Sequence, residues 1–162
     1  MKKLTILSLV LLTALSFTAC RKNCCDAGPQ PDLLTAKKGS AEWVSKTQEI
    51  NTYNDSLFVF GNVGEQHLRF RIKFTGVGKY VLEGSQANYT ETIGGDVTAV
   101  EYHDDPAAES VLNIIGYDKD NKIYVGNFTL NLQRGYRYDP LDAYYPQKLA
   151  FTNGNFKITL AK

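Results

Sequence analysis

The sequence predicts an all-β fold, and more narrowly an antiparallel β-sandwich or flattened barrel of about eight to ten strands. The 162 residues include ten Tyr, eight Phe and thirteen Gly against a single Met, a composition that favours strands and tight turns over helices. Several short stretches alternate apolar and polar residues with a period of two, and none sustains a helical period.

The chain begins with a segment typical of an export signal. Lys2 and Lys3 precede an uncharged, mostly apolar run that is short for a bilayer span and ends in small residues before Cys20. We therefore expect residues 1–19 to be a lipoprotein signal peptide and Cys20 to be lipidated after cleavage. The mature protein is then expected to be anchored to the cell envelope, at the periplasmic face of the outer membrane, with display on the cell surface left open.

The charge balance argues against a nucleic-acid partner. The chain has 18 Lys and Arg, of which two leave with the signal peptide, so 16 basic residues remain against 17 acidic ones and the mature formal charge is −1. Binding to a phosphate backbone needs a basic excess that this balance lacks.

Residues 20–39 are expected to form a flexible linker, because they are polar, contain Gly28-Pro29-Gln30-Pro31 and show neither a helical nor a strand period. All three cysteines fall within six residues, so no disulfide can cross-link the body of the domain and its core must hold by packing. Cys24 and Cys25 are adjacent, which would strain a bond between them. We interpret them as thiols of the tether, with a redox or soft-metal role as the alternative.

A single all-β domain is expected over residues 40–162, opening near Ala41 to Val44 and continuing with a strand at Ser56 to Phe60. The clearest signal is the next strand, His67 to Phe74, where apolar and basic or imidazole side chains alternate strictly. The alternation predicts a core-facing set, Leu68, Phe70, Ile72 and Phe74, and a solvent-facing set, His67, Arg69, Arg71 and Lys73.

Turn signals divide the rest of the domain. Gly76-Val77-Gly78 is expected to turn the chain into a hairpin-like unit. Asn153-Gly154 predicts a closing hairpin, because both positions tolerate the positive φ of a type I′ turn. The strands expected around these and the intervening turns cover residues 79–82, 89–92, 97–102, 110–115, 122–132, 148–152 and 155–160.

Short turn and core motifs follow the lipidation signal in a definite order. They are Ala41-x-Trp43, the Gly-Lys-Tyr-x-Leu step at residues 78–82, Tyr117-Asp118 before Gly126-x-Phe128, and the Thr-Asn-Gly-x-Phe closing segment at residues 152–156. In this order the chain resembles a group of small uncharacterised lipoproteins of Bacteroidota, classed as a domain of unknown function. The resemblance implies export and a β fold, and it carries no catalytic residues.

No pattern in the sequence predicts catalysis, a metal site or a cofactor. A Gly-x-Ser-x-Gly elbow and a Cys/His pairing are both absent, which removes the usual signals of nucleophilic hydrolysis. His103-Asp104-Asp105 could supply metal ligands but is better explained as a loop before Pro106. The segment Asp118 to Asn121 has a hint of calcium-loop spacing, and a hairpin turn explains it equally well.

Two surfaces are candidates for binding. The row His67, Arg69, Arg71 and Lys73 could meet an anionic glycan or lipid headgroup, unless acidic neighbours across the sheet neutralise it. A long connection from Gly135 to Pro146 is rich in tyrosine, which suits sugar rings or a protein partner unless the rings merely cap the core. Its candidate ligand-binding residues are Tyr136, Arg137, Tyr138, Tyr144 and Tyr145.

The sequence leaves two candidate functions open. The favoured one is a lipid-anchored envelope module that binds a glycan or protein partner without catalysis. The alternative is a small glycan-processing hydrolase whose carboxylates are brought together by the fold. A concave pocket with paired Asp or Glu near the tyrosine-rich connection would favour the enzyme, and a filled core with an aromatic surface patch would favour binding.

Overall fold

The computed structural model describes residues 32–45, 47–138 and 144–160. The strands of these residues all pair antiparallel, which confirms the predicted all-β class, although they number eleven rather than eight to ten. Within the described ranges no helix has the length and apolarity to cross a membrane. The predicted signal peptide, residues 1–19, and Cys20, Cys24 and Cys25 lie outside the described residues.

The strands are short to moderate in length except for the last two, which are long and pair with each other. In chain order they are β1 (Leu33–Lys38), β2 (Ala41–Ser45), β3 (Thr47–Tyr53), β4 (Ser56–Val63), β5 (Gln66–Lys73), β6 (Gly78–Leu82), β7 (Ala87–Ile93), β8 (Val97–Asp104), β9 (Ser110–Asp118), β10 (Ile123–Arg137) and β11 (Lys148–Thr159).

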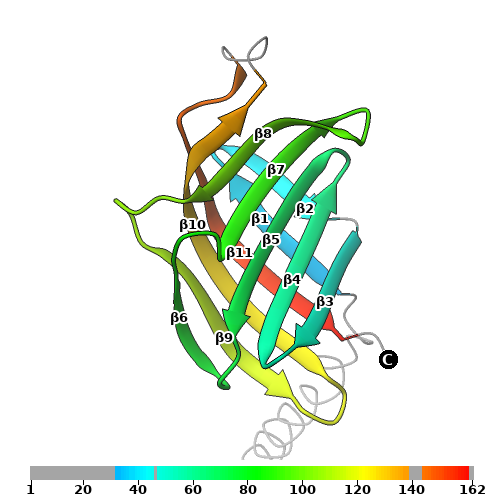
Figure 1. Ribbon diagram of the computed structural model, residues 1–162. Helices are drawn as coiled ribbons and strands as arrows, with labels where there is room; N and C mark the ends of the chain where they lie inside the picture. Colours follow the sequence, from blue (N-terminus) through cyan, green and yellow to red (C-terminus); the bar gives the residue numbers. More distant parts are fainter. Residues whose placement is uncertain (1–31, 46, 139–143, 161–162) are drawn as a thin grey trace, which may run out of the picture. The chain divides into compact units, whose positions relative to one another are not determined.

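These strands form one sheet in the order β2-β1-β11-β10-β8-β7-β5-β4-β3, and β9 joins β10 beside this path with β6 at its other edge. The order does not return to its starting strand, so the sheet is not closed into a barrel. Figure 1 shows β3, β4, β5, β7 and β8 in front of β1, β2 and β11, so the sheet folds over and encloses a core between two layers. The sandwich form of the prediction is therefore the better description.

The core is centred on the ring of Phe70, which projects inward from β5. Its centroid lies 5.3 Å from that of Phe128 on β10 and 6.0 Å from that of Phe156 on β11. Each of the latter rings lies over the glycine opposite it in the register: Phe128 over Gly154 and Phe156 over Gly126. A Cβ at Gly154 would stand 2.5 Å from ring carbons of Phe128, and one at Gly126 would likewise collide with Phe156. Only glycine leaves room for these rings.

The orientation predicted for β5 is confirmed. Leu68, Phe70 and Ile72 are at most 2% exposed, whereas Arg69 and Arg71 are exposed. Lys73 is also exposed, His67 is half-buried, and Phe74 is partly buried against the core.

The predicted boundary between linker and domain at residues 39 and 40 was wrong. β1 lies within the predicted linker, pairs with both β2 and β11, and buries Leu34 and Ala36 completely or nearly so. Asp32 accepts a hydrogen bond from the Thr159 backbone N–H at 2.8 Å, and the compact unit begins there. Ladder hydrogen bonds and burial of Leu34 offset the ordering entropy that argued for a linker.

The predicted closing hairpin at Asn153-Gly154 was also wrong, because β11 continues through it without reversing. Asn153 has φ of 52°, and the pairing of β11 with both β1 and β10 shifts register here. The positive φ that suits a tight turn serves equally in a β-bulge. The unit expected after Gly76 differs too, since β6 pairs with β9 and not with β5.

Replacing Phe70 by Ala should lower the free energy of unfolding by about 3–5 kcal/mol, because the ring is buried against two others and its removal leaves a cavity. The neighbouring change Arg71→Ala should cost about 0.5 kcal/mol or less, because that side chain is exposed. Urea unfolding of both variants measures the difference, and similar losses for the two would contradict the register of β5.

Candidate ligand-binding sites

The tyrosine-rich segment is divided by the structure. β10 extends to Arg137, so Tyr136 and Arg137 are strand residues opposite Glu101 and Val100 of β8, and not part of a loop as predicted. Tyr138 continues the pairing through its N–H, which donates to Ala99 at 2.7 Å. Residues 139–143 lie outside the described residues.

Tyr144 and Tyr145 instead border a hollow of about 610 Å³ between β1, β7, β8 and β11. We refer to it as the tyrosine hollow. A volume of this size falls within the usual range for small-ligand sites. Tyr136, Arg137 and Tyr138 do not border it. Its lining residues are Lys38, Glu91, Ile93, Tyr102, Tyr144, Tyr145, Pro146 and Leu149.

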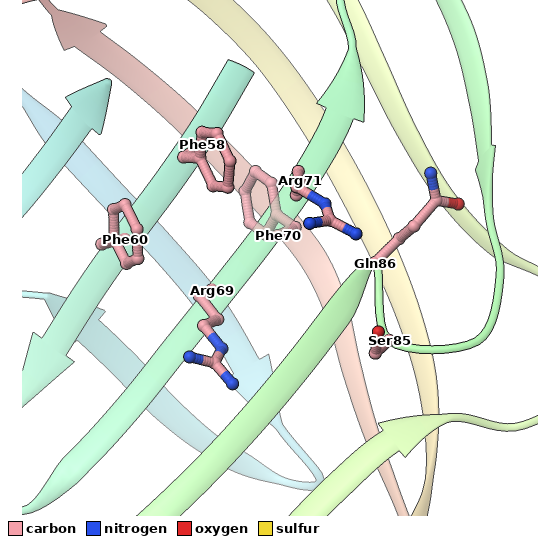
Figure 2. A pocket seen from close by; sticks show the side chains of 7 residues that line it. All are labelled: Phe58, Phe60, Arg69, Phe70, Arg71, Ser85 and Gln86. Carbon is pink, nitrogen blue, oxygen red and sulfur yellow. The ribbon is translucent and has the colours of Figure 1, made fainter. Parts of the chain in front are cut away.

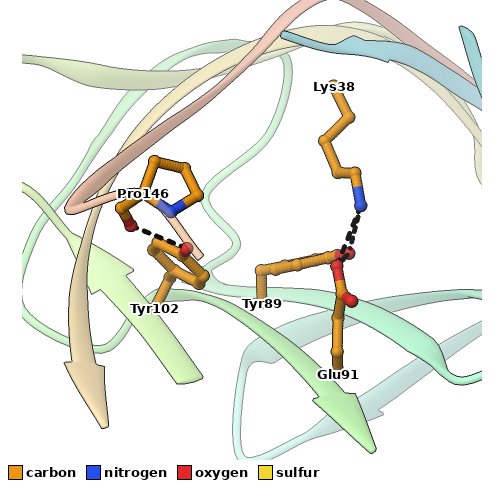
Figure 3. Close-up of polar contacts among 5 residues, drawn as sticks. All are labelled: Lys38, Tyr89, Glu91, Tyr102 and Pro146. Atoms are coloured by element: carbon orange, nitrogen blue, oxygen red, sulfur yellow. Dashed lines mark hydrogen bonds and ion pairs between the residues drawn. The ribbon is translucent and has the colours of Figure 1, made fainter. Parts of the chain in front are cut away.

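Two rows of inward-facing side chains, one on β1 and one on β7, each end in a charged residue at this hollow. On β1, Leu34 and Ala36 are followed by Lys38, and on β7, Tyr89 is followed by Glu91, each at a spacing of two. The Lys38 ammonium donates to the Tyr89 hydroxyl at 2.8 Å and lies 2.9 Å from the Glu91 carboxylate (Figure 3). The Tyr89 hydroxyl in turn donates to Glu91. The three groups satisfy one another and connect the two layers of the sheet.

Two further hydrogen bonds hold the segment that carries Tyr145. The Tyr102 hydroxyl donates to the Pro146 carbonyl at 2.8 Å (Figure 3). The Arg134 guanidinium donates to the Tyr145 carbonyl. Tyr145 is accordingly half-buried, whereas Tyr144 is 79% exposed at the rim of the hollow.

Burial controls the ionisation of the phenols here. Desolvation, together with the hydrogen bond to Glu91 and its negative charge, raises the pKa of Tyr89. Desolvation raises the pKa of Tyr102 to about 12, although the positive charge of Arg134 acts in the opposite direction. The pKa of Tyr145 is raised by desolvation and by the charge of Glu91. All three phenols are therefore neutral donors and acceptors at ordinary pH.

The tyrosine hollow consequently offers rings and hydrogen-bonding groups without unbalanced charge. Glu91 is the sole carboxylate among its described lining residues, and Lys38 neutralises it. Glycoside hydrolysis usually needs two carboxyl groups facing the scissile bond. The arrangement suits binding of an uncharged polar ligand better than bond cleavage. Sequence reasoning missed Lys38, Tyr89 and Glu91, although the spacing of two was visible in both segments.

Two members of the predicted basic row, Arg69 and Arg71, border a different hollow, of about 280 Å³, on the outer side of the sheet. Arg69 and Arg71 of β5 stand opposite Phe60 and Phe58 of β4. Figure 2 shows both guanidinium groups on the same side of the sheet as these two rings, with Phe70 directed to the other side. We call Phe58, Phe60, Arg69 and Arg71 the basic-aromatic face. Phe70 and, just before β7, Ser85 and Gln86 also line the hollow.

The other two members of the predicted row do not line this hollow. His67 is hydrogen-bonded through Nδ1 to the side-chain oxygen of Asn62 at 2.7 Å. Lys73 lies at the end of β5, opposite Ser56. Of the predicted row, Arg69 and Arg71 thus line this hollow, together with Phe58 and Phe60, which were not predicted.

The remaining candidate ligand groups are engaged within the fold. His103 lies on β8, not in a loop as predicted, and its Nδ1 is 3.2 Å from the Asn88 side-chain nitrogen. Asp105 forms an ion pair with Lys148 at 2.7 Å. Asp118 accepts the backbone N–H groups of Asp120 and Asn121, as a hairpin turn requires. In the described part of the chain no group of three or more His, Cys, Asp or Glu could hold a metal ion.

The described residues form a small all-β domain, and the tyrosine hollow and the basic-aromatic face are two of its surface hollows. The family described as Domain of unknown function (DUF6252) matches residues 30–158, and the chain belongs to this family. The match confirms the expected membership in a family of uncharacterised domains. It also begins before β1, in agreement with the corrected boundary. No curated protein and no solved structure matches the chain.

Stability should decline as the pH rises from about 10 to about 12. A tyrosine in an unfolded chain ionises near pH 10, whereas Tyr102 in the folded protein ionises at about 12. The unfolded chain releases its proton first, so the stabilisation is fully present below pH 10 and is lost above it. Unfolding by urea at stepped pH measures this loss.

Tyr102→Phe should reduce the alkaline loss without abolishing it, because Tyr89 has a raised pKa as well. Tyr53→Phe is the matched control, since it removes the hydroxyl of a side chain that is 69% exposed. An alkaline loss in Tyr102→Phe equal to that of the unmodified protein would contradict the assignment.

Proposed function

We propose that this protein is an exported, lipid-anchored module of the cell envelope that binds a glycan in the tyrosine hollow without catalysing a reaction. The observation that carries the proposal is the composition of the hollow. Tyr102, Tyr144 and Tyr145 border it, and its charged groups, Lys38 and Glu91, neutralise each other.

Such a lining fits the chemistry of an uncharged sugar. Tyrosine provides a flat apolar ring for the C–H face of a sugar and a hydroxyl for its polar groups. Ligand sites are mostly apolar with a few placed polar groups. Lys38 and Glu91 supply such groups at the wall of the hollow, and the buried Tyr89 hydroxyl holds them in place. The contacts to Pro146 and Tyr145 fix the hollow in advance, which lowers the entropic cost of binding.

The tyrosine hollow lacks the pair of carboxylates that the hydrolase alternative needs. Its second carboxylate would have to face Glu91 across the hollow, and the described lining residues provide none. Glu91 forms an ion pair with Lys38, which suits a structural role in the wall of the hollow better than proton transfer to a substrate.

Attachment to the membrane is proposed from the N-terminal pattern alone. Two lysines, an apolar run and small residues before Cys20 are typical of a lipoprotein signal. More than one acyl chain is needed for stable anchoring, since each buried methylene contributes about 0.8 kcal/mol. The proposed location is the periplasmic face of the outer membrane.

Cys20→Ala should abolish incorporation of a fatty-acid analogue during metabolic labelling and should release the protein from the membrane fraction. Cys24→Ala is the matched control and should keep both label and membrane association. Label retained in Cys20→Ala would contradict the proposed anchor.

Tyr144→Ala should weaken retention of neutral envelope oligosaccharides by about tenfold, equivalent to about 1.4 kcal/mol, and leave the melting temperature unchanged, because the ring is 79% exposed. Tyr53→Ala, at an exposed ring that does not line the hollow, should affect neither quantity. Unchanged retention in Tyr144→Ala would remove the tyrosine hollow as the binding site.

A further inference from the structure

We propose that the basic-aromatic face is a second binding site, and that it takes an acidic sugar: a pyranose ring that carries a carboxylate. The site is independent of the tyrosine hollow, with which it shares no lining residue. An experiment that supports or refutes this second site therefore does not bear on the function proposed for the tyrosine hollow.

The site is created by strand alternation in β4 and β5. Leu57 and Val59 are fully buried, so Phe58 and Phe60 project from the opposite face of the sheet. Their rings are nearly parallel, with an angle of 5° between planes and 6.3 Å between centroids. Phenylalanines that are half-buried rather than enclosed present a flat apolar strip on the outside of the domain.

Two positive charges border this strip. The Arg71 guanidinium lies 5.9 Å from the centre of the Phe58 ring, and Arg69 stands opposite Phe60. On its other side Arg69 faces Asn88, whose amide nitrogen donates to Glu101. The residues directly across from both arginines are thus aromatic or amide and not acidic, and within the described ranges neither guanidinium forms an ion pair.

This arrangement departs from the usual solution for charged strand residues. Cross-strand partners of opposite charge normally balance a basic row. Here Arg69 and Arg71 are neighbours on one strand, about 6.6 to 6.8 Å apart at Cα, with neither balanced directly. An anion seated against both would relieve that repulsion and gain charge-assisted hydrogen bonds.

The combination of groups selects among anions. A guanidinium fork matches the two oxygens of a carboxylate. Stacked phenyl rings add apolar contact that an inorganic ion cannot use but that the C–H face of a sugar ring can. The hollow, at about 280 Å³, accommodates roughly one sugar residue of a ligand. An acidic sugar uses both the rings and the charges, whereas a neutral sugar or a bare anion uses only one of them.

The test uses trisaccharides of uronic acids and the same trisaccharides after chemical reduction of each carboxylate to an alcohol. Titration calorimetry on the protein without its signal peptide should detect the acidic form of at least one of them. Reduction should weaken its binding at least tenfold. Failure of every acidic trisaccharide to bind, or equal binding of the reduced form, would overturn the proposal.

A charge-matched pair of variants locates the site. Arg69→Gln combined with Arg71→Gln should weaken binding of the acidic trisaccharide at least tenfold. Lys37→Gln combined with Lys119→Gln removes the same net charge at side chains outside this hollow, and it should change the affinity less than twofold. Equal losses in the two double variants would show general electrostatic attraction only and would overturn a site at this face.

Phe60→Leu tests the role of the ring, because it keeps apolar volume and removes the flat surface. It should weaken the acidic trisaccharide several-fold, with a melting temperature close to that of the unmodified protein. Inorganic phosphate and free galacturonate are the remaining probes: galacturonate should compete with the trisaccharide and phosphate should not. Competition by phosphate at the same concentration as galacturonate would overturn the assignment of a sugar.

Discussion

The contact of Phe70 with Phe128 and Phe156 is the constraint on which the rest of the structure depends. It joins β5 in one layer to β10 and β11 in the other, and it requires glycine at positions 126 and 154. An aromatic ring that covers a cross-strand glycine buries apolar area while the hydrogen bonds between the two strands are kept. Because the cysteines lie ahead of the first strand, no disulfide can share this task, and packing must hold the two layers together.

Both candidate sites follow from the same register. The alternation that directs Phe70 inward directs Arg69 and Arg71 outward, beside the rings of β4. At the end of the sheet the inward rows of β1 and β7 continue past the apolar core to Lys38 and Glu91. A shift of one residue in β5 would bury its arginines and expose its core residues, so surface chemistry and stability are determined together.

Features that depend on residues close together in the chain could be predicted from the sequence. Strict alternation identified β5 and its two faces, and the turn residues between β9 and β10 predicted their hairpin. The errors arose where partners distant in sequence decide the outcome. β1 is a six-residue strand after a Pro-rich segment, stabilised by β2 and β11. Asn153 carries a positive φ within a strand, because β1 and β10 pair with β11 on both sides of it. The phenylalanines beside the arginines required the pairing of β4 with β5, which a single sequence does not specify.

Native-state hydrogen exchange tests the central role of the ring cluster most directly. If Phe70, Phe128 and Phe156 hold the layers together, the backbone amides of β5, β10 and β11 around them should exchange only through global unfolding. Their opening free energies should then equal the free energy of unfolding measured with denaturant. A markedly lower opening free energy for β5 than for β10 and β11 would contradict the account, because it would mean that one layer separates while the other stays folded.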